Sequence, residues 1–338
     1  MTRSLRIHPM HFNSFFFFCF IIFHFQHISI LFFSCIDHLN FRWKKFASAI
    51  AGGNGKGDRL NQFNGTPGIF IDDQNHVIYV ADFDNHRVME WKLDANVARI
   101  VAGGNGQGNR LDQLNQPTDV KVDRENNDLL IADHGNRRVM RWSRHSNSPP
   151  QIIIDDIDCS RLAMHEDGTL YVSDGKKHEV KRWKKGETQG TVVTGGNGEG
   201  TQLNQLDCPM FLFVDDDHTL YISDWENHRV MKWIEGAKEG IVVAGGNGPG
   251  HRLTQLSTPR GIIVDRFGQI YVADRDNHRV MRWREGEKEG TLVVGGNGKG
   301  SRNDQLFGPT GLSFDEEENL YVADWGNNRI EKFEQDWD

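Results

Sequence analysis

The stretch Tyr271-Val-Ala-Asp-Arg-Asp-Asn-His-Arg-Val-Met-Arg-Trp283 occurs in six versions along this 338-residue chain. Each version has an Asp that ends an apolar run, then a turn, then a second run that ends in an aromatic residue. The Asp residues stand at positions 82, 133, 174, 224, 274 and 324, so successive copies lie 51, 41, 50, 50 and 50 residues apart. A period of this size is typical of repeat architectures.

Each repeat contains four short predicted strands. In the fifth copy they are residues 261–265, 269–274, 279–283 and 291–294, with Gly-rich turns between them. The alternation of apolar and charged residues in 279–283 predicts a strand that is exposed on one face. Such meanders bury both faces only by packing against one another, and closing the row into a ring removes its ends. The sequence therefore predicts an all-β, six-bladed β-propeller of four-stranded antiparallel blades.

The last repeat lacks a fourth strand, because the chain ends shortly after residues 329–333. Residues 46–51 directly precede the first Gly-Gly-Asn-Gly loop, where the other repeats have their fourth strand. We predict that this N-terminal strand completes the last blade and that the propeller spans residues 44–338. The Gly-Gly-Asn-Gly loops lack the Lys-Ser/Thr and the helix of a phosphate-binding loop, so we interpret them as structural.

Residues 1–36 differ in composition from the repeats. Arg3 and Arg6 precede a Phe- and Ile-rich run over residues 12–33, followed by Ser34 and Cys35. This order is typical of a secretory signal peptide, and the run is also long enough to anchor a chain in a membrane. A wrongly assigned gene start is the third interpretation. Either export interpretation predicts a protein that is secreted or lies on the extracellular side of a membrane, attached through residues 12–33 in the anchor case.

The formal charge of −8 and the pI of about 6.0 argue against nucleic-acid binding, which needs a basic face. We expect a monomer. Cys159 and Cys208 stand at nearly equivalent positions of successive repeats, either bridged in an oxidising compartment or free. The absence of a Cys-x-x-Cys pair from the sequence excludes a zinc ribbon.

A polar residue that occurs in every repeat is expected to build the repeat. We expect the repeated Asp to accept hydrogen bonds from the turn that follows it, the Arg to pair with a carboxylate, and the Asn to have a positive φ. The Asp set is Asp82, Asp133, Asp174, Asp224, Asp274 and Asp324; the Arg set is Arg87, Arg138, Arg229, Arg279 and Arg329; the Asn set is Asn85, Asn136, Asn227, Asn277 and Asn327.

The turn histidines His86, His178, His228 and His278 lie on separate blades, too far apart to converge on an ion, so the sequence predicts no metal and no cofactor. The informative residues are those that break the symmetry. The third repeat is short and lacks its preceding Gly-Gly-Asn-Gly loop, and His165 replaces the Asp found at 72, 123, 215, 265 and 315. Drift in a decaying repeat is the alternative explanation.

We predict a ligand site on the axis at the top face, which we define as the end that carries the turns between second and third strands. The predicted residues are Asp119, Lys121, Arg161, His165, Met210, Phe211 and Arg260. We expect Arg161→Ala and Asp119→Ala to weaken binding without changing the melting temperature.

The Tyr-Val-Ala-Asp and Asn-His-Arg-Val motifs, the aromatic residue after them and the Pro-x-Gly that opens the inner strand resemble the NHL-repeat family over residues 44–338. This resemblance implies a six-bladed propeller and says little about function. The expected function is an exported, non-catalytic scaffold that binds a protein, a peptide or a glycan. The sequence shows no Ser-His-Asp, Cys-His or carboxylate pair at non-repeated positions, so no catalytic residue is predicted.

Two alternatives stay open: a propeller lyase or hydrolase with an axial site, and a substrate-recognition module like those of ubiquitin ligases. In the NHL-family peptide-amidating lyases, a zinc-binding His directly follows the Pro that opens an inner strand. Here those positions hold Gly68, Thr118, Met210, Arg260 and Thr310. The resemblance therefore argues against that lyase chemistry.

Overall fold

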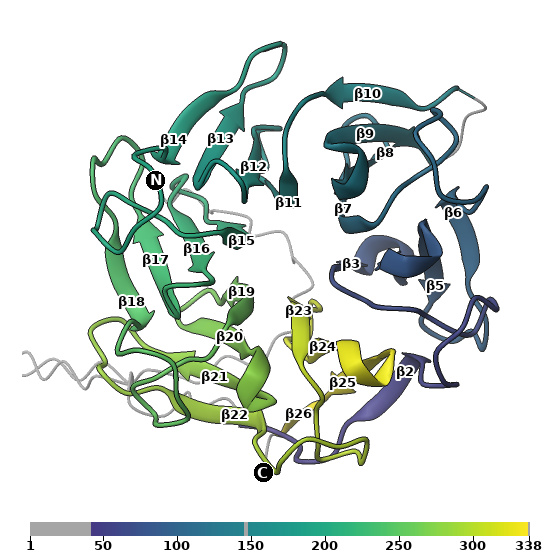
Figure 1. Ribbon diagram of the computed structural model, residues 1–338. Coiled ribbons are helices and arrows are strands. Elements are labelled where there is room, and N and C mark those ends of the chain that lie inside the picture. Colours follow the sequence, from purple (N-terminus) through teal and green to yellow (C-terminus); the bar gives the residue numbers. More distant parts are fainter. Residues whose placement is uncertain (1–41, 145–147, 337–338) are drawn as a thin grey trace, which may run out of the picture. The chain divides into compact units, whose positions relative to one another are not determined.

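The computed structural model describes residues 42–144 and 148–336, and their strands form six four-stranded antiparallel sheets around a central axis (Figure 1). This architecture confirms the predicted six-bladed propeller. The predicted signal peptide or anchor, residues 1–36, lies outside the described residues. Within the described part of the chain, no helix has the length and apolar character needed to cross a membrane.

Within each blade the first strand lies nearest the axis and the fourth lies at the rim (Figure 1). Blade one contains β3 (Ile69–Asp72), β4 (Val77–Asp82), β5 (Arg87–Lys92) and β6 (Arg99–Gly103). Blade two contains β7 (Pro117–Asp123), β8 (Asp128–Asp133), β9 (Arg138–Ser143) and β10 (Gln151–Ile154). Blade three contains β11 (Cys159–Met164), β12 (Leu170–Asp174), β13 (Glu179–Trp183) and β14 (Thr191–Gly195).

Blade four contains β15 (Pro209–Val214), β16 (Leu220–Asp224), β17 (Arg229–Trp233) and β18 (Ile241–Gly245). Blade five contains β19 (Pro259–Val264), β20 (Ile270–Asp274), β21 (Arg279–Trp283) and β22 (Thr291–Gly295). Blade six contains β23 (Pro309–Phe314), β24 (Leu320–Asp324), β25 (Arg329–Phe333) and β2 (Ser48–Gly52). Short 3-10 turns are η1 (Asp73–Asn75), η2 (Phe83–Asn85), η3 (His134–Asn136), η4 (Arg275–Asn277) and η5 (Trp325–Asn327).

The hydrophobic core is divided into layers between neighbouring blades, such as the layer that joins Tyr171 of blade three to Met231 and Trp233 of blade four. Because a blade is covered on both faces, successive residues of its middle strands are buried. All five residues of β21 are buried, so the prediction that this strand is exposed on one face was wrong. The charged residues of β21 form polar contacts within the packed ring instead of facing water.

The N-terminal strand closes the ring. β2 pairs antiparallel with β25, with Ala49 opposite Glu331 and Gly52 opposite Arg329. Blade six is thus built from three C-terminal strands and one N-terminal strand, as predicted. Gly52 has a φ of +72°, and a Cβ at this position would lie 2.4 Å from the Asn328 carbonyl oxygen, so the strand end requires glycine.

A second clasp was not predicted from the sequence. β1 (Arg42–Trp43) pairs with β26 (Gln335–Asp336), so the two ends of the described chain meet again beyond blade six. The Trp43 indole packs edge-on against Tyr271 with ring centroids 5.4 Å apart, and its Nε1 donates to the Glu318 carbonyl oxygen at 3.1 Å. This one side chain therefore links the leading segment to blades five and six.

Side-chain amides hold the Gly-Gly-Asn-Gly loops in shape. In the first loop the Asn54 amide donates to the Asn61 carbonyl oxygen at 3.0 Å, and the Gln62 amide donates to the Asn54 carbonyl oxygen at 2.8 Å. The same pair recurs at Asn197 and Gln205. These internal bonds support the structural interpretation of the loop.

The connection between blades two and three replaces one such loop. Only four residues separate β10 from β11, and Arg137 contacts Asp156 at 2.8 Å and Asp158 at 3.4 Å there. Glu179 stands where the other blades have Arg, and the Oδ2 atom of Asp174 is left without a hydrogen bond. Blade three therefore departs from the repeat in its polar network as well as in its length.

Candidate ligand site on the propeller axis

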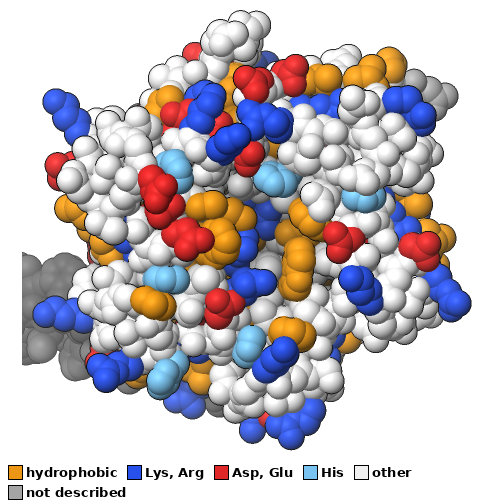
Figure 2. Space-filling model, in the orientation of Figure 1, with side chains coloured by type: hydrophobic (Ala, Val, Ile, Leu, Met, Phe, Trp, Pro, Cys, Tyr) orange, Lys and Arg blue, Asp and Glu red, His pale blue; other side chains and the backbone are white. Residues whose placement is uncertain are grey.

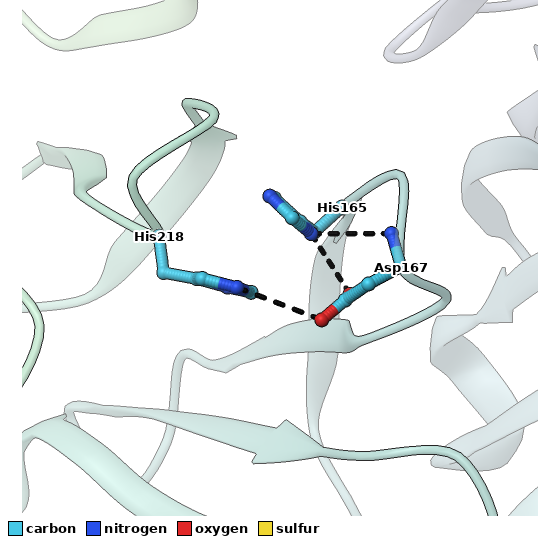
Figure 3. A group of neighbouring side chains, drawn as sticks. All are labelled: His165, Asp167 and His218. Atoms are coloured by element: carbon cyan, nitrogen blue, oxygen red, sulfur yellow. Dashed lines mark hydrogen bonds and ion pairs between the residues drawn. The ribbon is translucent and has the colours of Figure 1, made fainter.

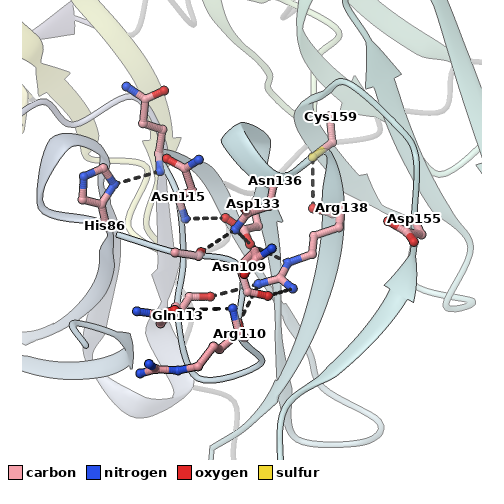
Figure 4. Close-up of polar contacts among 12 residues, drawn as sticks. His86, Asn109, Arg110, Gln113, Asn115, Asp133, Asn136, Arg138, Asp155 and Cys159 are labelled. Carbon is pink, nitrogen blue, oxygen red and sulfur yellow. Dashed lines mark hydrogen bonds and ion pairs between the residues drawn. The ribbon is translucent and has the colours of Figure 1, made fainter. Parts of the chain in front are cut away.

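The repeated Asp and Arg side chains bind each other within five of the six blades. The Arg Nε lies 2.6–2.8 Å from the Asp Oδ2 in blades one, two, four, five and six. In blade two, Arg138 also donates to the carbonyl oxygens of Asn109, Arg110 and Gln113, and Asp133 accepts from the Asn115 backbone N–H (Figure 4). These bonds hold the loop of residues 109–115 against blade two. The Asp and Arg side chains are therefore used to build the repeat.

Burial raises the pKa of Asp274, while hydrogen bonds from Ser257, Asn277 and Arg279 lower it. Burial of a carboxylate is tolerated here because every face of the group has a donor. A positive φ was expected at the repeated Asn, but the residue after it has the positive φ instead. Asn85 lies in η2 and donates to Asp82, and the left-handed residue is His86, at a φ of +54°.

The turn histidines accept hydrogen bonds from the loop of the next blade. His86 Nδ1 accepts from the Gln116 backbone N–H at 3.1 Å, and His178, His228 and His278 repeat this contact at the same distance. The left-handed turn conformation thus presents the ring to the neighbouring loop. These histidines join successive blades.

Two cavities share the axis. The top cavity, of about 200 Å³, is lined by Pro67, Phe83, Thr118, His134, Ser160, Arg161, Met210, Arg260, Arg275, Thr310 and Trp325. The bottom cavity, of about 210 Å³, is lined by parts of all six inner strands, including Asp119, Lys121, Phe211 and again Arg161. Figure 2 shows hydrophobic and basic side chains around the central hollow of the ring.

Arg161 crosses the axis between the two cavities. Its side chain is 2% exposed, and its Nη2 donates to the Pro67 carbonyl oxygen of the β3 approach at 2.7 Å. The guanidinium carbon lies 3.8 Å from the centroid of the Phe211 ring. Burial lowers the pKa of Arg161 to about 10, and Asp119 acts in the opposite direction. The group therefore stays charged at neutral pH, and among the described residues it has no carboxylate within ion-pair distance.

Arg260 adds a second guanidinium at the top cavity. It lies over the Trp225 indole, 4.5 Å from the ring centroid, and its buried Nε has no hydrogen-bond partner. Burial, followed by the charges of Arg161 and Arg275, lowers the pKa of Arg260 to about 9. Two cations that repel each other across a partly apolar cavity, without a carboxylate between them in the described chain, form a site that favours an anion.

The structure brings most of the sequence-predicted residues together on the axis. Met210 and Arg260 line the top cavity, Asp119, Lys121 and Phe211 line the bottom cavity, and Arg161 borders both. Asp119, Lys121 and Phe211 were therefore wrongly assigned to the top face, and His165 lines neither cavity. It lies in the turn between β11 and β12, at the face opposite to the top, so its assignment to the axial top face was wrong. The inner strand runs from top to bottom, and His165 follows its last residue.

The rim of the top cavity was not predicted from the sequence. Phe83, His134, Arg275 and Trp325 line it, and Trp225 supports Arg260. All five are the residue directly after the repeated Asp. This position varies from repeat to repeat, whereas the Asp before it occurs in every repeat, and this variation was the available signal.

Cys159 and Cys208 are free thiols in this structure. The Cys159 thiol is buried and lies 3.2 Å from the Arg138 carbonyl oxygen, and burial raises its pKa. Burial also raises the pKa of Cys208 to about 11. A thiol that stays protonated at neutral pH is a poor nucleophile, so neither group is suited to covalent catalysis.

Comparison with known protein families supports this fold. The family model described as the NHL repeat matches residues 256–282, which include the end of one Gly-Gly-Asn-Gly loop region and the first three strands of blade five. The chain is a six-bladed β-propeller that contains the NHL repeat. No curated protein matches the sequence of this NHL propeller significantly.

Solved structures share the fold of this NHL propeller. A protein of unknown function from Bacteroides thetaiotaomicron is 18% identical with a TM-score of 0.68, over 86% of this chain and 76% of that one. An auxiliary nutrient binding protein from the same species is 17% identical with a TM-score of 0.66, over 86% and 76%. A virginiamycin B lyase from Staphylococcus aureus is 11% identical with a TM-score of 0.56, over 82% and 97%. Identities this low establish the fold alone.

Proposed function

We propose that this NHL propeller is an exported, non-catalytic binding protein whose top cavity holds an anionic group of a peptide or glycan. The observation that carries the proposal is the pair Arg161 and Arg260, two guanidiniums at one cavity with no carboxylate in ion-pair distance among the described residues. The aromatic rings of Phe83 and Trp325, 5.8 Å apart at the rim, provide a surface for the apolar part of the ligand. A structural relative described as an auxiliary nutrient binding protein is consistent with a ligand on such a scaffold.

We favour binding over catalysis because the polar side chains of the cavity do not form a hydrogen-bonded Ser-His-Asp chain. Ser160 and His134 line the same cavity, with Asp158 behind them. His134 Nδ1 stands 3.7 Å from the Asp158 carboxylate, beyond hydrogen-bond distance, and no hydrogen bond joins Ser160 to His134 in the part of the chain that the structure describes. The relatives described as lyases keep the enzyme alternative as the second hypothesis.

Arg260→Met is expected to weaken binding of an anionic probe by about tenfold to a hundredfold, the usual loss for a charge-assisted hydrogen bond. The probes are glucuronate and a peptide with a free carboxyl terminus, each measured by calorimetry beside its neutral counterpart, glucose or the amidated peptide. The melting temperature is expected to stay equal or rise, because the variant removes a poorly paired cation.

Arg252→Met is the matched control, because Arg252 is exposed on a top-face loop. Equal affinity for charged and neutral probes, or an equal loss in both variants, would contradict the proposal. Arg161 and Asp119 are poorer test positions than we expected from the sequence. Arg161 bonds to Pro67 and Asp119 accepts from the Leu162 N–H, so each also joins separate blades and its loss should lower the melting temperature.

Export is a separate part of the proposal and rests on the composition of residues 1–36. We expect the expressed protein to reach the medium or the outer side of a membrane, with a new N-terminus near Ser34 if the segment is cleaved. Fractionation and N-terminal sequencing measure both. A cytosolic, soluble form that retains Met1 would contradict export and would favour the substrate-recognition alternative.

A further inference from the structure

A cluster of His165, Asp167 and His218 lies on the bottom face, at the turns that follow β11 and β15 (Figure 3). His165 Nδ1 is 2.8 Å from Asp167 Oδ1, and His218 Nε2 is 3.5 Å from Asp167 Oδ2. The two imidazole rings are stacked with centroids 3.8 Å apart. The side chains come from blades three and four, so the cluster bridges two blades.

This arrangement replaces a contact that blades five and six make internally. In blade five, Asp265 accepts from the Tyr271 hydroxyl at 3.1 Å, and Asp315 accepts from Tyr321 in the same way in blade six. In blade three the Asp is replaced by His165, and the Tyr171 hydroxyl lies 2.9 Å from His218 Nδ1 instead. When Nδ1–H donates to the Tyr171 oxygen, His218 Nε2 directs its lone pair toward Asp167.

The surroundings of His165 select its tautomer in the same way. His165 Nε2 lies 3.3 Å from the Asp216 carbonyl oxygen, which only accepts, so Nε2 is the donor of this bond. In the neutral ring the Nδ1 atom then carries a lone pair, to which the Asp167 backbone N–H donates at 3.2 Å. In that form Nδ1 and the Asp167 carboxylate are two acceptors 2.8 Å apart, an arrangement that a bound cation or a proton on Nδ1 stabilises.

We propose that His165, Asp167 and His218 bind one divalent transition-metal ion, most simply Zn²⁺, on the bottom face. Zinc takes imidazole nitrogen and carboxylate oxygen at about 2.0–2.2 Å, so tetrahedral ligand atoms lie roughly 3.3 Å apart. The observed contacts of 2.8 and 3.5 Å lie on either side of this spacing, and the three ligand atoms are all within 4.8 Å of one another. Two imidazoles favour Zn²⁺, Ni²⁺ or Cu²⁺ over Mg²⁺ and Ca²⁺.

Three protein ligands leave the fourth position of the ion open to water or to a donor from a partner. Half-buried histidines and an exposed carboxylate also give the ion access from solvent. Bound metal would tie blade three, which has lost its loop and its Asp–Arg pair, to blade four. The site was not expected from the sequence, because His165 and His218 lie 53 positions apart and meet only in the folded ring.

Calorimetry on the full chain, freed of metal with a chelator, tests the proposal with ZnCl₂ and MgCl₂. We expect Zn²⁺ binding that Mg²⁺ does not reproduce. His165→Asn should remove one equivalent of zinc while preserving the fold, because Asn has the size and the acceptor oxygen of the Asp that the other five blades carry, while its neutral amide is a poor zinc ligand. Tyr171→Phe should weaken zinc binding by about tenfold to a hundredfold, as loss of a hydrogen bond to a ligating His usually does.

His251→Ala is the control, because this exposed His lies on a top-face loop away from the cluster. A second control is His178→Ala, since His178, Glu199 and Asp207 form another group of potential ligands. Zinc binding that is absent, that persists in His165→Asn, or that follows His178 would overturn the proposal. In that case His165 carries an extra proton and forms an ion pair with Asp167.

Discussion

Replacing Trp43 with alanine is expected to lower the free energy of unfolding by about 3–5 kcal/mol, the usual loss for a large buried aromatic side chain. Trp43 is 8% exposed and packs on Tyr271 and Phe314 at centroid distances of 5.4 and 6.0 Å. Its loss would open a cavity beneath the point where the two chain ends meet. Chemical denaturation of the full chain measures the effect, with a fall in the midpoint and no change in slope.

Phe46→Ala is the control for this experiment. Phe46 belongs to the same leading segment, but its side chain is 64% exposed, so its loss should cost well under 1 kcal/mol. Equal effects of the two substitutions would show that β1 does not contribute to the cooperative unit. Deleting residues 44–52 removes β2 and should unfold the ring as a whole, because blade six then lacks its outer strand.

Glu331→Met is expected to raise the free energy of unfolding by about 1–3 kcal/mol at pH 9, the cost of an unsatisfied buried polar group. Glu331 lies in the closing blade, is 0% exposed and accepts no hydrogen bond of good geometry, although Arg329 Nη2 is 2.9 Å away. The corresponding positions of blades one, two, four and five hold Met89, Met140, Met231 and Met281. The substitution therefore restores the apolar residue that the repeat favours.

The stability of the native protein should also depend on pH, because the Glu331 carboxyl is buried. Burial raises the pKa of Glu331 to about 8, with Arg329 acting in the opposite direction. Between about pH 4.5 and 8 the unfolded chain loses this proton and the folded chain keeps it, so the stability of the native protein should fall as pH rises through this window. In Glu331→Met this fall should disappear. Denaturation midpoints at pH 5, 7 and 9 measure it.

Glu334→Gln is the comparison for the pH series, because Glu334 is exposed and pairs with Lys44 at the surface. Its effect should be small at every pH. A stability of Glu331→Met below that of the native protein at pH 9 would mean that the carboxylate stabilises the closing blade through Arg329, contrary to our interpretation.

Much of the architecture could be predicted from the sequence because each repeat is formed by residues close together in the chain. A blade is a contiguous meander, so the Asp-to-Asp period counted the blades, and the unpaired strand before the first Gly-Gly-Asn-Gly loop identified the closure. Two of the errors concerned how a strand is covered and which end of the ring a residue reaches. Strand β21 was predicted to be half exposed, and both of its faces are covered. His165 was placed on the top face, and the direction of β11 carries it to the bottom.

The candidate site shows the same division. Arg260 and Arg161 stood out in the sequence because they interrupt the symmetry of the inner strands. That Arg260 lies over Trp225, and that Arg161 reaches a carbonyl 94 positions away, depends on the curvature of the ring. The rim residues Phe83 and Trp325 were not predicted because they lie in the turns that follow the repeated Asp.

The sequence by itself determined the number of blades, their strand order, the closing strand and the NHL repeat, since each is specified by residues a few positions apart. Only the tertiary structure decided which side chains share the axial cavities, which histidines meet Asp167, and how Trp43 joins the two ends. These contacts join different blades, so they depend on how the blades pack in the closed ring, which the period of the repeat does not specify.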